Sequence, residues 1–152
     1  DQDIQRLRAL LLEGASSPAG APVNAGYFED LRITPPPRGF VTGKPVVPRA
    51  RARADADLAI EHYLAEAGAD VALGFIDALE RVYAVIGAAP ATGSPRWAHE
   101  LNLPGLRTYR LRGYPWLVFY IEQSEHIDVW RILHSKRDIP VWMTESSIEA
   151  ED

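Results

Sequence analysis

The chain has 152 residues, of which 47% are hydrophobic and 24% charged, with a formal net charge of -5 and no cysteine. This composition excludes a disulfide scaffold and a thiolate metal site, and an acidic balance disfavours a general nucleic-acid binder. No apolar run reaches the ~20 residues of a membrane span, so we expect one globular domain with appendages, in the cytoplasm and without a membrane partner.

Two short amphipathic helices are predicted in the first 33 residues. The first covers residues 3–13, with Asp3 as its N-cap and Gly14 as its end. The second follows Asn24. Helices this short are marginal alone in water, so both require a host surface. Their apolar residues are Ile4, Leu7, Leu10, Leu11, Val23, Tyr27, Phe28 and Leu31.

Residues 34–45, TPPPRGFVTGKP, hold four of the twelve prolines. Such a composition is typical of an extended connection rather than a packed element. It predicts a linker between a segment at 1–33 and a domain at 46–144, and residues 145–152 remain as an acidic tail.

Beyond the linker, a short extended stretch at VVPRARA precedes two helices. Asp55 or Asp57 is expected to cap the first, which Gly68 ends, and Asp70 to cap the second, which Gly87 ends. The second helix carries the best helical stripe of the chain, so the two form an antiparallel hairpin. That stripe consists of Phe75, Ile76, Leu79, Val82, Tyr83 and Ile86.

Three strands follow, at 106–112, 115–121 and 126–133. Their alternation and their β-branched and aromatic residues are typical of strands, and short polar turns separate them. An antiparallel meander is therefore expected, with the middle strand buried on both faces. The fold class is α+β, in the order β-α-α-β-β-β.

Residues with catalytic potential are sparse. The four histidines, His62, His99, His126 and His134, lie too far apart in the sequence to place two ligands on one helix face, so we expect no metal. No glycine pattern cradles phosphate and no nucleophile stands out, so no cofactor or catalytic residue is predicted.

Arginines are the remaining candidates for a site. Arg107, Arg110 and Arg112 on the first meander strand, with Arg131 on the last, would gather guanidinium groups at one end of the sheet. Such a cluster can bind phosphate, but charge also protects an exposed edge strand, and both readings stay open.

The stretch RILHSKRDIPVWM, residues 131–143, ends the last strand in a charged turn. His134, Lys136 and Arg137 could form a site there, but Asp138 and Pro140 suit a turn that closes the fold. Taken alone, this pattern favours a structural corner.

Residues 46–143 resemble the ParE branch of the RelE/ParE toxin superfamily. The resemblance is carried by RARADADLAIEHYLAEAG, LPGLRTYRLRGYPWLVFYI and, most specifically, VWRILHSKRDIP. Residues 3–32, with a leucine helix, a Gly/Ser/Pro break and an aromatic second helix, are similar to the toxin-wrapping C-terminal part of a ParD antitoxin.

The resemblance implies a toxin of a type II toxin-antitoxin system that inhibits DNA gyrase by binding, without catalysis. A ParD-like segment on the same chain or a neighbouring copy would neutralise it. The implied target-binding residues are Arg107, Arg110, Arg112, Arg131, His134, Lys136 and Arg137. The implied antitoxin contacts are Ile4, Leu7, Leu11, Tyr27, Phe28 and Leu31.

ParD proteins usually begin with a ribbon-helix-helix dimer that binds operator DNA, and no residues here correspond to it. We therefore expect no direct DNA binding by this chain. An upstream DNA-binding part and a direct joining of toxin to antitoxin fragment both fit the sequence.

Two alternatives remain. A RelE-like, ribosome-dependent mRNA endonuclease would need dense cations and a proton-transfer group. Only Lys44 and Lys136 are lysines, although Arg131 and His134 occupy the strand end where such groups would lie. The second alternative is an α+β interaction module without toxicity.

Overall fold

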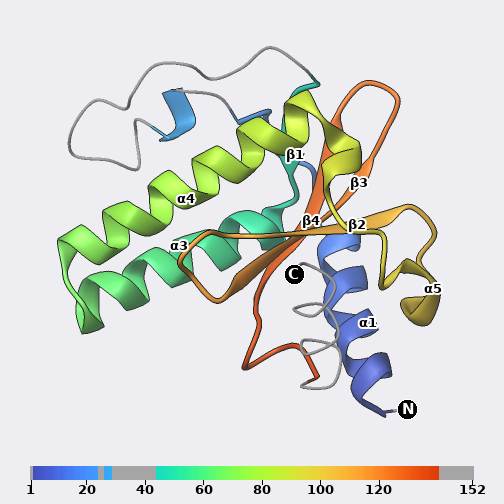
Figure 1. Ribbon diagram of the computed structural model, residues 1–152, viewed down its shortest axis with the longest axis horizontal. Coiled ribbons are helices and arrows are strands. Elements are labelled where there is room, and N and C mark those ends of the chain that lie inside the picture. Colours follow the sequence, from blue (N-terminus) through green and yellow to red (C-terminus); the bar gives the residue numbers. More distant parts are fainter. Residues whose placement is uncertain (1, 24–25, 29–43, 141–152) are drawn as a thin grey trace.

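A computed structural model describes residues 2–23, 26–28 and 44–140 (Figure 1). Leu31, most of the predicted linker and the acidic tail lie outside these residues. The elements are α1 (Gln2–Ser16), β1 (Val46–Pro48), α3 (Ala50–Glu66), α4 (Ala69–Ala88), the 3-10 turn η1 (Pro90–Thr92), α5 (Ala98–Leu101), β2 (Leu106–Arg110), β3 (Trp116–Glu122) and β4 (Ile127–His134). This order confirms the predicted α+β class.

The sheet has the strand order β1-β4-β3-β2. Strands β2, β3 and β4 form the predicted antiparallel meander. The first strand departs from the expected antiparallel sheet, since β1 pairs in parallel with β4 through Val46–Pro48. A helix hairpin rather than a tight turn connects β1 to the meander, and such a connection permits parallel pairing.

Helices cover both faces of this sheet, and the two layers can be followed in Figure 1. The central strand β3 alternates between them: Trp116, Val118 and Tyr120 face α3 and α4 in a main core. Its other side chains, Leu117 and Phe119, face α1 and α5 in a second core. The predicted burial of β3 on both sides is therefore confirmed. The second core consists of Leu7, Leu11, Trp97, Leu101, Leu103, Leu106, Leu117, Phe119, Leu133 and Ile139.

Helix α1 lies close against β4. Leu7 and Leu11 are 0% exposed, and the helix runs through Gly14 to Ser16 instead of ending at Gly14 as predicted. A Cβ on Gly14 would lie 2.1 Å from the Trp130 carbonyl oxygen, so glycine is needed here for close packing against the strand. The same residue type that suggested a helix end instead allows the helix to approach the sheet.

The chain after α1 runs along the outer edge of β1. Val23 donates a backbone hydrogen bond to Val46 (2.8 Å), and Ala19 forms an antiparallel bridge with Arg49. Residues 26–28 are helical, and Phe28 is fully buried in the main core, edge-on to Tyr83 at 5.8 Å. The segment 19–23 thus covers the edge strand β1, which would otherwise expose unpaired backbone groups.

Helix α3 begins earlier than the sequence predicted. Its N-cap is Arg49, which makes no capping side-chain bond and instead holds Asp128 through Nε at 2.9 Å. Asp55 and Asp57 therefore lie inside the helix, and the prediction that one of them caps it is wrong. The start of α3 is fixed by the end of β1, a tertiary constraint that a local capping pattern does not contain.

Helix α4 is capped by Gly68, with φ +102°, rather than by Asp70, which lies in the first turn. It ends at Ala88, one residue beyond the predicted end at Gly87. Within the described residues no helix is both long and apolar enough to cross a membrane.

The position of Gly14 gives a test of how α1 docks. Gly14→Val should lower the free energy of unfolding by about 1–3 kcal/mol, because the added side chain forces α1 away from β4. Ala9→Val on the exposed side of α1 is the matched control and should cost only its helix propensity, below about 1 kcal/mol. Urea unfolding measures both, and equal losses would contradict the close packing described here.

Candidate functional site

The seven predicted target-binding residues occupy three different places. Arg107, Arg110 and Arg112 lie on or just after the edge strand β2, and Arg131 lies beneath α1. His134 ends β4, and Lys136 and Arg137 follow in the turn. Because β2 and β4 finish at the same end of the meander, Arg110 and His134 share that end, whereas Arg131 is set apart by its burial.

Arg131 is a buried junction between α1, α3 and β4. It is 8% exposed, and its Nε and Nη2 atoms each donate to the Asp55 carboxylate at 2.7 Å. Its Nη1 donates to Glu13 Oε1 at 2.9 Å and to the Leu10 carbonyl at 3.1 Å, both on α1. The hydrogen bonds that Arg131 donates to Asp55 are the main reason that the pKa of Arg131 is raised. Two of its partners thus belong to the N-terminal segment.

A β-bulge in β4 places Arg131 at this junction. Phe119 pairs with Arg131 and Tyr120 with Val129, which leaves Trp130 as the extra residue. Strand β1 pairs only with residues 127–129 of β4. Beyond them, the Ile132 backbone nitrogen donates a hydrogen bond to the Asp55 carboxylate at 3.0 Å. Because alternation along the sequence does not reveal a bulge, sequence reasoning grouped Arg131 with the exposed arginines.

His134 is fixed by the turn that follows β4. Its Nδ1 accepts hydrogen bonds from the backbone nitrogens of Lys136 (3.1 Å) and Arg137 (3.2 Å), and its own backbone nitrogen donates to Asp138. Asp138 in turn donates its backbone nitrogen to the His134 carbonyl at 2.9 Å, which confirms the predicted turn. Burial, followed by the nearby Arg137 charge, lowers the pKa of His134. The imidazole is thus held in its neutral form.

A pocket of about 320 Å³ opens beside His134, between α3 and the end of the sheet. Trp116 lies edge-on to the imidazole at 5.0 Å and donates its Nε1 hydrogen to the Tyr63 hydroxyl at 2.9 Å. Sequence reasoning missed His62 and Tyr63 because on α3 they look like ordinary surface residues. The pocket is lined by Asp55, Leu58, Ala59, His62, Tyr63, Trp116, His134 and Arg137.

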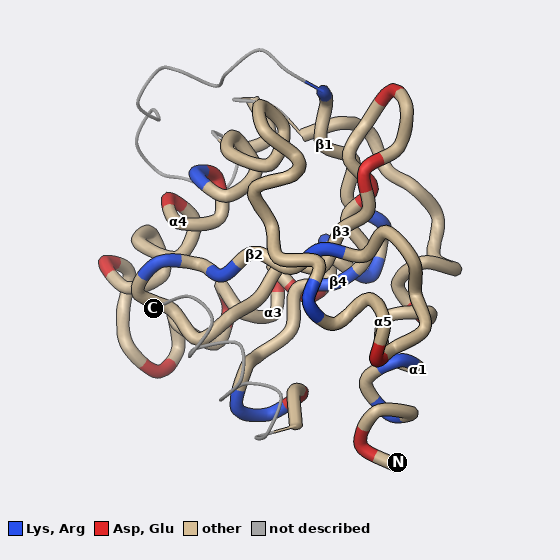
Figure 2. The backbone as a smooth tube through the Cα atoms, turned by 45° about the vertical axis from the view of Figure 1, so that its right-hand side comes forward, with Lys and Arg blue, Asp and Glu red and all other residues tan. Residues whose placement is uncertain are grey.

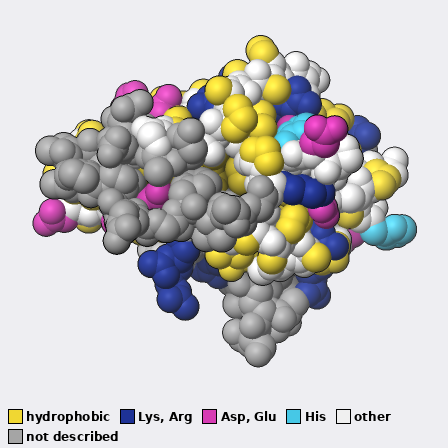
Figure 3. Space-filling model, turned by 90° about the horizontal axis from the view of Figure 1, so that it is seen from above, with side chains coloured by type: hydrophobic (Ala, Val, Ile, Leu, Met, Phe, Trp, Pro, Cys, Tyr) yellow, Lys and Arg dark blue, Asp and Glu magenta, His cyan; other side chains and the backbone are white. Residues whose placement is uncertain are grey.

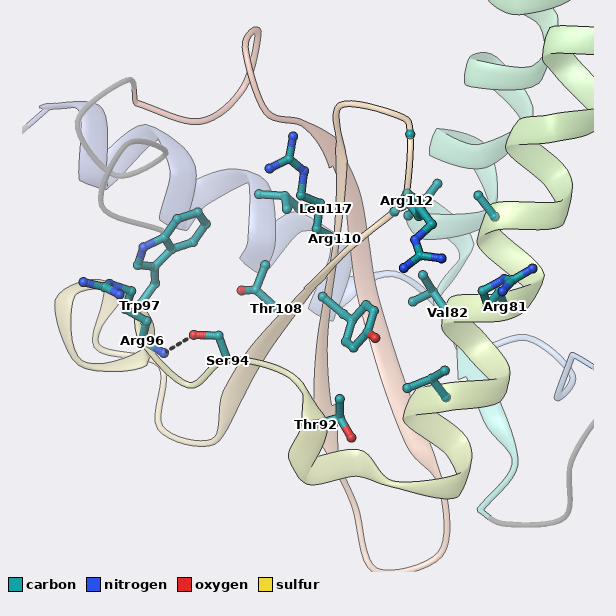
Figure 4. Close-up of a pocket in the computed structure, with 15 residues that line it drawn as sticks. Arg81, Val82, Thr92, Ser94, Arg96, Trp97, Thr108, Arg110, Arg112 and Leu117 are labelled. Atoms are coloured by element: carbon teal, nitrogen blue, oxygen red, sulfur yellow. Dashed lines mark hydrogen bonds between the residues drawn. The ribbon is translucent and has the colours of Figure 1, made fainter. Parts of the chain in front are cut away.

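Arg110 and Arg112 line a larger opening of about 640 Å³ along the β2 edge (Figure 4). Arg81 of α4 and Arg96 before α5 complete this arginine trough and were not predicted, since they come from separate elements. Figure 2 shows basic stretches of β2 and α4 on the same side of the molecule. Arg107 contributes differently, donating to the carbonyls of Ala91 and Gly93 at 3.2 and 2.7 Å.

Charge on the remaining surface is interspersed. On the described part of the face seen from above, acidic, basic and hydrophobic side chains alternate without a continuous field of one sign (Figure 3). Across the described ranges, no three His, Asp or Glu side chains gather as metal ligands. The geometry therefore provides polar surfaces and, at His134, a partly buried imidazole beside a pocket.

Comparison with known proteins matches more than half of the chain to one protein family. Residues 46–139 match the family model of the ParE toxin of the type II toxin-antitoxin system, parDE. No curated protein matches the chain. Among solved structures, the chain is similar to one titled the chromosomal ParDE TA system from P. aeruginosa, with a TM-score of 0.48 and 24% identity, covering 56% of this chain and 88% of that chain.

The helix hairpin and the small sheet at residues 46–139 therefore form the body of a toxin from a type II toxin-antitoxin system. The matched region covers more than half of the chain, and the chain belongs to the ParE toxin family. The predicted toxin resemblance is confirmed for residues 46–139, and membership of a toxin-antitoxin family implies an antitoxin partner.

The Arg131 junction predicts unequal costs for its two carboxylates. Asp55→Asn should lower the free energy of unfolding by about 3 kcal/mol or more, because it leaves the buried guanidinium with only the half-exposed Glu13 as a charged partner. Glu13→Gln should cost clearly less, since the Glu13 side chain is 46% exposed and Arg131 keeps Asp55. Chemical denaturation of both isosteric variants measures the difference, and equal losses would refute the central role of Asp55.

The lowered pKa of His134 predicts a loss of stability in mild acid. The unfolded chain takes up a proton near 6.5 and the folded chain only at lower pH, so the free energy of unfolding falls as pH drops through that value. His134→Asn, which keeps an acceptor but does not titrate, should reduce this slope. Urea unfolding at a series of pH values measures this slope, and an unchanged slope in His134→Asn would contradict the prediction.

Proposed function

We propose that this ParE-family toxin inhibits DNA gyrase by binding, without catalysis, and that residues 1–33 act as a ParD-like segment that neutralises it in cis. The carrying observation is that α1 lies on the sheet face opposite the helix hairpin and supplies two partners of Arg131. Gyrase as target, and the cytoplasm as the place of action, follow from the general role of ParE toxins.

The contacts of the N-terminal segment are those of a docked partner. Leu7, Leu11 and Phe28 are 0% exposed, and burial of each contributes about 1.5–3 kcal/mol. Tyr27 and Ile4 pack at the margins of the two cores, and Leu31 lies outside the described residues. A linker of about a dozen residues keeps such a segment near millimolar effective concentration, which favours docking in cis.

The covered face has the composition of a binding surface. Without α1, Leu117, Phe119 and Leu133 would lose part of their cover, and Arg131 would keep only Asp55 as a side-chain partner. An apolar patch with an aromatic ring and an arginine is typical of interface hot spots. We infer that the antitoxin segment and the target compete for this face, and that Arg110, Arg112, His134, Lys136 and Arg137 at the adjoining end of the sheet, with Arg107 on the neighbouring edge, add further target contacts.

A RelE-like mRNA endonuclease is the second candidate, and it rests on His134. In the pocket beside Arg137, a neutral imidazole whose Nδ1 accepts from the backbone presents its Nε2 hydrogen, which could donate a hydrogen bond to a phosphate oxygen of RNA. The low number of lysines remains an argument against it.

Release of α1 from the sheet by a substitution tests the proposal in the full chain. Leu11→Asp places a charge in the second core and should release α1, so that expression halts growth and purified protein inhibits gyrase supercoiling. Gln5→Asp, on the exposed side of α1, should remain harmless. Rapid loss of translation with mRNA cleavage would favour the endonuclease, and full neutralisation of Leu11→Asp would contradict masking by α1.

A further inference from the structure

The arginine trough gathers four positive charges outside the face that α1 covers. Its four guanidinium groups come from α4, the loop before α5 and the end of β2, and all four arginines are exposed. Within the ranges that the structure describes, none of these guanidinium groups makes an ion pair, and no Asp or Glu lines the opening. Like charges gathered in this way create a local site for anions.

Hydroxyl groups lie between the arginines. Figure 4 shows Thr92, Ser94 and Thr108 between Arg96 at one end of the trough and Arg81 and Arg112 at the other. Arginine forks combined with hydroxyl donors are the side chains that contact phosphate oxygens of nucleic acids. The trough is therefore chemically suited to a phosphate-bearing ligand.

The backbone of β2 is not available to add a peptide strand at the centre of the trough. Thr108 exchanges both of its outward hydrogen bonds with Ser94, at 2.9 and 3.0 Å, and the Leu106 nitrogen donates to the Leu103 carbonyl. Recognition by addition of an acidic β-strand would require these groups. This disfavours an extended acidic peptide as the occupant.

Aromatic residues of the trough do not form a stacking platform. Trp97 is 2% exposed and stacks on Phe119 at 5.9 Å, and Tyr109 packs against the main core. Single-stranded nucleic acids are typically held by exposed rings on which bases stack. The side chains present favour contact with the backbone of a duplex, where the bases stay paired.

We propose that the arginine trough binds the phosphodiester backbone of duplex DNA. The missing ribbon-helix-helix part led to the expectation of no direct DNA binding, and the net charge of -5 disfavours a general nucleic-acid binder. Screening limits the reach of distant charges to about 8 Å at physiological salt, so the local cluster decides. One part of the proposal rests on the proposed function: when the toxin is bound to gyrase, the trough would also contact the DNA that gyrase holds. Binding to free DNA is independent of that part.

The test uses the full chain, in which the trough is open while α1 is docked. Fluorescence anisotropy of a labelled short duplex of mixed sequence is followed between about 50 and 200 mM KCl. The double variant R110S/R112S should bind more weakly, and its slope of log K against log salt should be shallower by about two. R81S, on a different element, should reduce the slope by about one.

R6S removes an exposed arginine from α1 and is the matched control, expected to bind like the parent chain. Circular dichroism verifies that all variants are folded. Absence of salt-dependent binding by the parent chain, or unchanged binding by the double variant, would overturn the proposal. So would equal competition by a poly-glutamate peptide, which would identify an acidic protein surface instead. Because no gyrase is present, these outcomes are separate from those of the supercoiling assay.

Discussion

The whole structure depends on covering a sheet that is apolar on both faces. The hairpin of α3 and α4 covers one face, and α1 with α5 covers the other. Residues 46–139 carry the toxin family match, yet much of the cover over Leu117, Phe119 and Leu133 comes from outside that range. A small sheet domain with one open apolar face requires a partner, and here the partner is supplied by the same chain.

Arg131 connects this hydrophobic arrangement to the charged groups. Its bidentate pair with Asp55 belongs to the toxin body, whereas Glu13 and the Leu10 carbonyl come from α1. Glu13 is also held by Arg51, whose hydrogen bond is the first cause of its lowered pKa. The N-terminal segment therefore docks by apolar burial in the second core and by one carboxylate at its edge. The first gives affinity, and the second fixes the register of the helix on β4.

Much of this fold could be predicted from the sequence, because strand alternation and the α4 stripe are local patterns. The errors arose where a tertiary contact determined the local structure. A glycine is required at position 14 because α1 packs against the Trp130 carbonyl. Asp55 lies inside a helix, where its carboxylate pairs with the buried Arg131. The site was harder to predict, since the bulge at Trp130 and the convergence of Arg81 and Arg96 on β2 exist only in three dimensions.

The two basic regions of the toxin body differ in accessibility, and this separates their roles. Arg131 pairs with carboxylates on two elements and is covered by α1, so it is not accessible in this structure. The arginines of the trough have no carboxylate in the lining and lie on α4, before α5 and at the end of β2. A cis-acting segment could thus silence the apolar target face while leaving an anion-binding edge exposed. Such a division would let the inhibited chain remain near nucleic acid and act when α1 is displaced.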